Sequence, residues 1–165
     1  ECLEIDSAVG SIYLYENSSW VLGEDFSVVT SIDKDLFGVE LKSPKFQIFP
    51  EESLSTFCDM VKKEGCRTTL TSGLHFHFSG PSFVKLCHIS SQDLQTLAYR
   101  LFCLAKPNKE RSKYCDYNTG YKHKRCALRQ VNGDHWECRV FNSTLDVNVI
   151  KSNFYKMLEV LNVVE

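Results

Sequence analysis

Two short segments of the chain place histidine, glutamate and arginine at alternating positions. His75 and His77 stand two residues apart in the run Gly-Leu-His-Phe-His-Phe. Glu137 and Arg139 have the same spacing in Trp-Glu-Cys-Arg-Val-Phe, and a third carboxylate, Glu40, stands between Val and Leu. Successive side chains of a strand point to opposite faces, so the ionisable groups of each segment share one face. Imidazole and carboxylate bind divalent metal ions and arginine binds phosphate, which predicts a site for phosphoryl chemistry.

A solvated sheet face is the competing interpretation of this pattern. Any antiparallel sheet with one face in water shows the same alternation of apolar and polar residues. The residue types favour a site, because solvated faces usually carry Thr, Lys, Ser or Gln rather than His, Glu and Arg. The spacing alone does not show that the three segments are neighbouring strands, so both interpretations stay open.

The elements that position these residues are expected to be short strands and three helices. Alternation and β-branched residues predict strands at 11–15, 20–22, 26–32, 37–41, 125–131 and 135–141, and one or two strands at 66–78 with a break near Ser72-Gly73. Apolar residues at three- and four-residue spacing predict helices at 51–64, 91–104 and 148–161. Ser91 is the expected cap of the second helix, Asn132-Gly133 the expected hairpin turn, and residues 106–124 mostly a loop. The pattern predicts one α+β domain over residues 1–165, with a curved antiparallel sheet packed by about three helices.

The composition is that of an ordinary globular protein. The chain has 165 residues, 43% of them hydrophobic and 24% charged, with a net charge of −2. This charge gives no general reason to expect a nucleic acid or membrane partner, and no apolar run approaches the ~20 residues of a membrane helix. The eight cysteines are irregularly spaced, which favours buried, reduced thiols over a disulfide scaffold. We expect a soluble protein, with a cytoplasmic location favoured.

The motifs resemble those of the amidoligases, which are carboxylate–amine ligases with a glutamine-synthetase-like fold. Residues 73–77, Gly-Leu-His-Phe-His, resemble the family motif Gly-Leu-His-Val-His. Residues 137–146, Glu-Cys-Arg-Val-Phe-Asn-Ser-Thr-Leu-Asp, are similar to the signature Glu-Phe-Arg-hydrophobic-Phe-Asn-Gly-Thr-Leu-Asp. Earlier elements follow the family's order through Trp20, Asp25, Ser27, Gly38, Glu40, Ser43 and Pro44.

The resemblance implies an ATP- and Mg²⁺-dependent ligase that forms an amide through an acyl-phosphate. Its substrates would be a small-molecule or peptide carboxylate and an amine. The chain would be active as it stands, or a protein partner or a second copy of the chain would complete the site. The resemblance implies three sets of residues: catalytic His77, Glu137 and Arg139; metal-binding Glu40, His75 and Glu137; ATP-binding Arg111, Lys124 and Arg139.

Two other functions compete with this one. The chain departs from the family pattern at Phe26, Cys138 and Ser143, and its N-terminal part is shorter than usual. These departures support a non-catalytic structural or interaction protein that keeps the ligase-like fold. Residues 106–129 interleave basic and aromatic side chains, which supports a third hypothesis of nucleic-acid binding, although such a stretch is more often a solvated loop. A zinc site would use Cys115, His123, Cys126, His135 and Cys138, but their spacing fits no common zinc finger.

Overall fold

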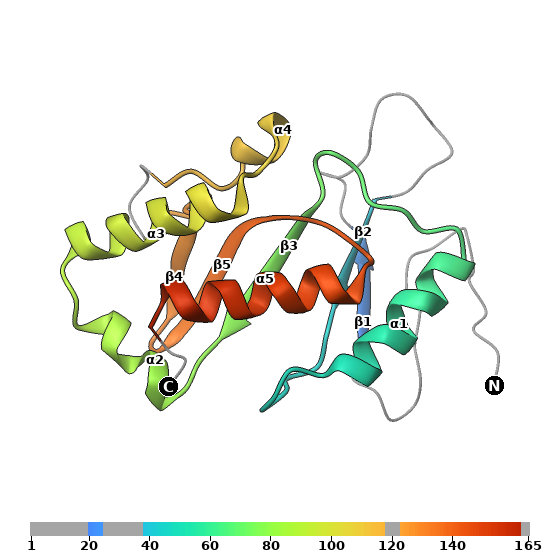
Figure 1. Cartoon of the computed structure of the whole chain (residues 1–165), viewed down its shortest axis with the longest axis horizontal. Helices are drawn as coiled ribbons and strands as arrows, with labels where there is room; N and C mark the ends of the chain where they lie inside the picture. The colour runs from blue at the N-terminus through green and yellow to red at the C-terminus, as the bar shows by residue number, and fades with distance from the viewer. Residues whose placement is uncertain (1–19, 25–37, 118–122, 163–165) are drawn as a thin grey trace. The chain divides into compact units, whose positions relative to one another are not determined.

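The computed structural model describes residues 20–24, 38–117 and 123–162. The strands predicted at 11–15 and 26–32 lie outside these residues. The chain divides into two units, residues 1–50 and 51–165. Figure 1 labels their helices and strands. The expectation that both form one domain therefore stays a prediction.

The first unit contains a two-stranded antiparallel ladder. Strand β1 is Val21–Glu24 and strand β2 is Val39–Lys42. Gly23 pairs with Glu40 in this ladder. The strand predicted to precede Pro44 is therefore confirmed, since proline has no N–H to continue a ladder.

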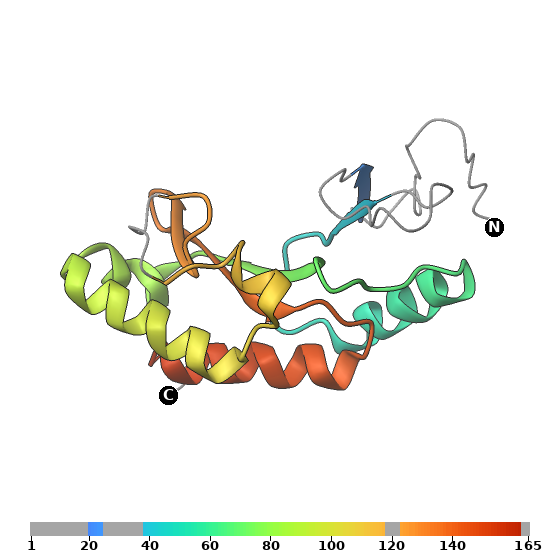
Figure 2. The same ribbon diagram turned by 90° about the horizontal axis from the view of Figure 1, so that it is seen from above.

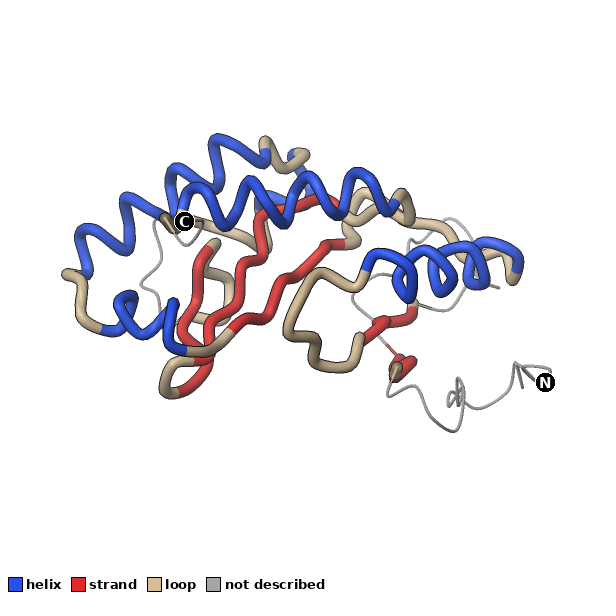
Figure 3. The backbone as a smooth tube through the Cα atoms, turned by 60° about the horizontal axis from the view of Figure 1, so that its bottom comes forward, coloured by secondary structure: helices blue, strands red, loops and turns tan. Residues whose placement is uncertain are grey.

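The second unit contains a three-stranded antiparallel sheet. Its strands are β3 (Gly73–Phe78), β4 (Leu128–Asn132) and β5 (His135–Asn142). The order is β3-β5-β4, so β5 lies in the middle (Figure 3). Residues 66–72 were also expected to be extended, but they form no strand.

The predicted hairpin between β4 and β5 is confirmed, but its turn lies one residue later than expected. Asn132 pairs with His135, so Gly133 and Asp134 form the turn instead of Asn132-Gly133. Gly133 has φ +48°, a left-handed conformation that favours glycine. The ladder shifts register between Gln130 and Asn132, which leaves one extra residue on β4.

The described residues of the second unit also form three longer helices and three single turns. The longer helices are α1 (Glu51–Lys63), α3 (Ser91–Ala105) and α5 (Val147–Val160). The single turns are α2 (Pro81–Val84), the 3₁₀ turn η1 (Lys85–Cys87) and α4 (Lys109–Ser112). The three predicted helices and the α+β class are confirmed, whereas α4 interrupts a segment that was expected to be mostly loop. No helix among the described residues is long and apolar enough to cross a membrane.

Side-chain caps fix where α3 and α5 begin. The Ser90 side chain accepts a hydrogen bond from the backbone N–H of Asp93, so Ser90 rather than Ser91 is the cap of α3. Asp146 accepts from two backbone N–H groups in the first turn of α5. Lys106 ends α3 in a left-handed conformation directly before Pro107.

Helices α3 and α5 lie on one side of the β3-β5-β4 sheet (Figure 2). The sheet residues Trp136, Cys138 and Val140 are fully buried, as are Leu101 of α3 and Met157 of α5, and all five belong to one apolar core. Since alternate β5 residues point to opposite faces, this core fixes the direction of Glu137 and Arg139 away from the two helices.

Candidate functional site

The pairing of the strands aligns three ionisable residues across the sheet. Glu137 on β5 is paired with His77 on β3 and with Arg129 on β4. His75 lies two residues before His77, at a register shift where this one residue of β3 lies opposite two residues of β5, Arg139 and Val140. The expectation that His75, His77 and Glu137 share one face is thereby confirmed, and their strands are neighbours.

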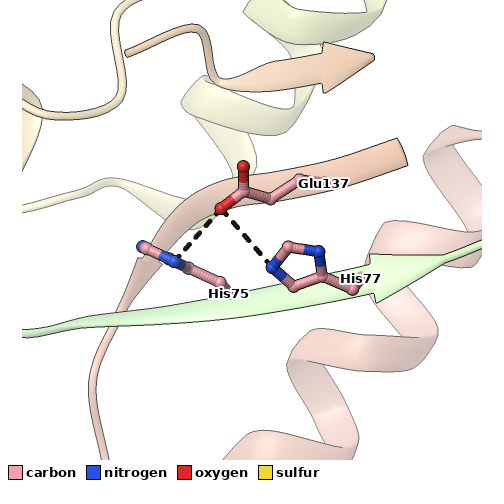
Figure 4. Close-up of side chains that lie close together, drawn as sticks. All are labelled: His75, His77 and Glu137. Carbon is pink, nitrogen blue, oxygen red and sulfur yellow. Dashed lines mark ion pairs between the residues drawn. The ribbon is translucent and has the colours of Figure 1, made fainter. Parts of the chain in front are cut away.

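The two imidazoles point to the same oxygen of Glu137 (Figure 4). His75 Nδ1 lies 3.2 Å from Oε1, and His77 Nε2 lies 3.6 Å from it. The longer distance exceeds that of an ordinary hydrogen bond. Glu137 and His77 therefore face each other with more room between their atoms than a direct hydrogen bond requires.

Two arginines hold the same carboxylate. Arg129 Nη1 donates a hydrogen bond of 3.2 Å to Oε2 of Glu137, and Arg139 Nη1 lies 3.6 Å from Oε1. Arg139 Nη1 also donates to the backbone carbonyl of Lys124 at 2.6 Å. Glu137 is only 4% exposed and is the one charged residue among the buried, described residues. Buried charges are costly unless they are paired, and this carboxylate is paired on both oxygens.

The surroundings set the protonation of the site. Burial alone would raise the pKa of Glu137, but the hydrogen bond from His75 and the charge of Arg139 lower it to about 2. Burial lowers the pKa of His77, and this exceeds the opposing effect of Glu137. At neutral pH Glu137 is a carboxylate and His77 is a neutral imidazole, which are the forms that bind a metal ion.

From the sequence, His135 is considered only in a zinc group and Arg129 only within a basic stretch, and neither residue is placed at this site. His135 Nε2 lies 3.0 Å from His77 Nδ1, so the two nitrogens of His77 face Glu137 and His135. A two-residue turn at Asn132-Gly133 would have paired Arg129 with Trp136, whereas the observed turn together with the extra residue in β4 pairs it with Glu137. Correct placement of the turn and of the extra residue in β4 would have identified Arg129.

The group His75, His77 and Glu137 can hold a metal ion. One ligand atom from each lies within 4.8 Å of the others, and this is the only such group in the part of the chain that the structure describes. Two ligand atoms about 2.1 Å from a tetrahedral ion lie about 3.4 Å apart, close to the two distances measured from Glu137. Imidazole suits Zn²⁺, whereas carboxylate suits Mg²⁺ and Mn²⁺, so this mixed set can accept any of the three ions, with Glu137 as the strongest ligand of Mg²⁺.

The remaining predicted site residues are not brought to this group by the described contacts. Glu40 belongs to the first unit, where it forms an ion pair of 2.9 Å with Lys42. Lys124 is exposed, and its backbone carbonyl accepts the hydrogen bond from Arg139. Arg111 lies in α4, and its side chain is outside the described structure. The roles of Glu40, Lys124 and Arg111 stay predictions.

Comparison with models of protein families, with curated proteins and with solved structures finds no match to this chain. The resemblance to amidoligases therefore stays a prediction from the sequence of the two motifs and the order of the earlier elements.

Proposed function

We propose that this chain is an ATP- and Mg²⁺-dependent carboxylate–amine ligase. The observation that carries the proposal is the convergence of the two amidoligase-like motifs. His75 and His77 come from the first motif and Glu137 from the second, and more than 50 residues separate the two motifs in the chain. In the structure, Oε1 of Glu137 lies 3.2 Å from His75 Nδ1 and 3.6 Å from His77 Nε2. Arginine next to this group supplies the positive charge that phosphoryl transfer requires.

The proposed reaction has two steps. A carboxylate oxygen of the acid substrate attacks the γ-phosphorus of ATP, and the bond to ADP breaks to give an acyl-phosphate. The nitrogen of the amine substrate then attacks the acyl carbon, the bond to phosphate breaks, and the nitrogen loses a proton. The products are an amide, ADP and inorganic phosphate.

The residues of the site have separate tasks in this proposal. Glu137 and His75 would hold the divalent ion, and His77 would complete its ligand set or orient the substrate. A bound Mg²⁺ would stabilise the negative charge on the oxygens of the transferred phosphoryl group. Arg139 would contribute further charge, while its hydrogen bond to the backbone carbonyl of Lys124 holds that residue beside the site.

Calorimetric titration with ATP in the presence and absence of Mg²⁺ tests the proposal. We expect saturable binding that requires Mg²⁺ and is weakened at least tenfold in His75→Ala and Glu137→Gln. His88→Ala and Glu159→Gln are matched controls because both residues are exposed and lie outside the site. Absence of binding by the folded wild-type chain would refute the proposal for this chain acting alone.

A catalytic test follows if the nucleotide binds. Hydroxylamine can replace the amine and trap an acyl-phosphate as a hydroxamate, which is measured by its coloured iron complex. We expect ATP-dependent hydroxamate formation from one member of a panel of amino acids and dicarboxylates. Formation of ADP without hydroxamate for every acid would identify an ATPase and contradict the ligase proposal.

A non-catalytic protein that keeps the ligase-like fold is the second candidate. It is favoured by the ion pairs of Glu137 with Arg129 and Arg139, because this network satisfies the carboxylate without a ligand. In that case Glu137 stabilises the fold alone. Folded wild-type protein that binds neither Mn²⁺ nor Mg²⁺-ATP, together with a less stable Glu137→Gln variant, would support this candidate.

A further inference from the structure

The exposed part of the site is positively charged although its centre is a carboxylate. The side chain of Glu137 is 5% exposed, whereas those of Arg129 and Arg139 are 28% and 18% exposed. Glu137 carries one negative charge, and the two arginines carry two positive charges. The net charge of the site is therefore at least +1, whether the histidines are protonated or not. A ligand that approaches from solvent therefore meets guanidinium groups before it meets the carboxylate.

The two arginines differ in how much of their hydrogen-bonding capacity they use. A guanidinium has five N–H donors. Among the described residues, the Arg129 side chain forms one hydrogen bond, from Nη1 to Glu137. Arg139, in contrast, holds the backbone of Lys124 as well as approaching Glu137. The Nε of Arg129 is buried without a hydrogen-bond partner, but the Arg129 side chain is more exposed than that of Arg139, so Arg129 presents the more accessible donors to a ligand.

We propose that Arg129 binds an oxyanion, the phosphate group of a nucleotide or the carboxylate of a substrate, next to Glu137. The guanidinium would donate to Glu137 and to the oxyanion at the same time, and its planar donors suit the paired oxygens of either group. The inference rests on the proposed ligase for the source of the oxyanion. Binding of the oxyanion itself requires no metal ion, so the two proposals can be tested separately.

Titration with simple anions in EDTA tests this proposal. Pyrophosphate represents the nucleotide source and glutarate the carboxylate source, and binding is measured by calorimetry at pH 7. We expect saturable binding of one of them, weakened about tenfold in Arg129→Met and less in Arg129→Lys, which keeps the charge but loses the planar donors. Arg100→Met is the matched control, because Arg100 is an exposed arginine on α3.

The variant Glu137→Gln should change anion affinity and metal affinity in opposite directions. Removing the carboxylate charge releases Arg129 and ends the repulsion of the oxyanion, while a metal ion loses its charged ligand. We expect this variant to bind the anion several-fold more tightly in EDTA and to bind Mn²⁺ at least tenfold more weakly. Weaker binding of both ligands in a folded Glu137→Gln protein would overturn the proposed arrangement.

The outcomes separate this inference from the proposed function. Anion binding that depends on Arg129, without Mg²⁺-dependent ATP binding, would support the inference and refute the ligase. Binding of Mg²⁺-ATP and of both anions at wild-type affinity by folded Arg129→Met would leave the ligase intact and overturn the inference. Failure of the wild-type chain to bind either anion would also overturn it. Circular dichroism and urea unfolding establish that each variant is folded.

Discussion

The two faces of the β3-β5-β4 sheet are built from the same strands but follow different physical rules. On the face against α3 and α5, Trp136, Cys138 and Val140 are fully buried and contribute mainly through the apolar area they remove from water. On the opposite face, Glu137 is equally inaccessible but is held by charged and polar neighbours. Stability on the first face depends on volume, and on the second it depends on charge balance. Changes of volume, pH and metal ion should therefore affect the two faces differently.

The largest effect is expected from removing volume on the apolar face. Trp136→Ala should lower the free energy of unfolding by about 3–5 kcal/mol, because it removes a fully buried side chain from the core and leaves a cavity. Urea unfolding measures this change. Leu104→Ala is the control, since Leu104 is 40% exposed on α3 and should cost far less. Equal losses in both variants would contradict the proposed division between the faces.

Acid should act on the opposite face through Glu137. Its folded-state pKa of about 2 lies below the ordinary value of 4.5, so the folded state resists protonation more than the unfolded state. This stabilisation is complete above pH 4.5 and is lost as the pH falls towards 2, a change of about 3 kcal/mol. Urea unfolding between pH 2 and 6 in EDTA should show this loss in the wild type and in Glu159→Gln, but much less of it in Glu137→Gln. The same slope in all three proteins would assign the acid sensitivity to other carboxylates.

The sequence predicts the apolar face better than the ionisable face, because the signals for the apolar face lie within short stretches of the chain. Helices α3 and α5 end within one residue of the predicted bounds because their apolar spacing and their caps are encoded nearby in the chain. The shared face of His75 and His77 follows from strand alternation in the same way.

The neighbours of Glu137 depend instead on pairing between strands, which short patterns do not contain. The extra residue in β4 and the turn at Gly133-Asp134 decide that Arg129 is paired with Glu137. The contact between His77 and His135 requires the register of β3 on β5. An error of one residue at the turn reverses which face Arg129 occupies, because the side-chain period of a strand is two.

A metal ion should stabilise the protein through the ionisable face alone. At 100 times its dissociation constant, Mn²⁺ should raise the free energy of unfolding by about 2.7 kcal/mol. His75→Ala should lose most of this gain, whereas His88→Ala should keep it, since His88 is exposed and outside the site. Trp136→Ala provides the second comparison: where it remains folded, it should still gain from Mn²⁺. Thermal unfolding with and without EDTA measures all four proteins. Identical gains in His75→Ala and the wild type would place the ion elsewhere.

The smallest effect is expected from His77, whose side chain is 52% exposed. His77→Gln should change the free energy of unfolding at pH 7.5 by less than about 1 kcal/mol, since a half-exposed polar side chain contributes little to stability. Its effect should instead be visible in the pH dependence. Because burial lowers the pKa of His77, the unfolded state takes up the proton first, and wild-type stability should fall as the pH drops below about 6.5 in EDTA.

In His77→Gln this fall should become smaller, while His88→Ala should keep the wild-type slope. Urea midpoints measured every half unit between pH 5 and 7.5 would resolve the difference. A wild-type slope in His77→Gln would mean that His77 is stabilised in its charged form by Glu137 as much as burial disfavours it. The electrostatic potential beside Glu137 would then be negative despite Arg129 and Arg139. A negative potential there would favour a metal ion over an oxyanion.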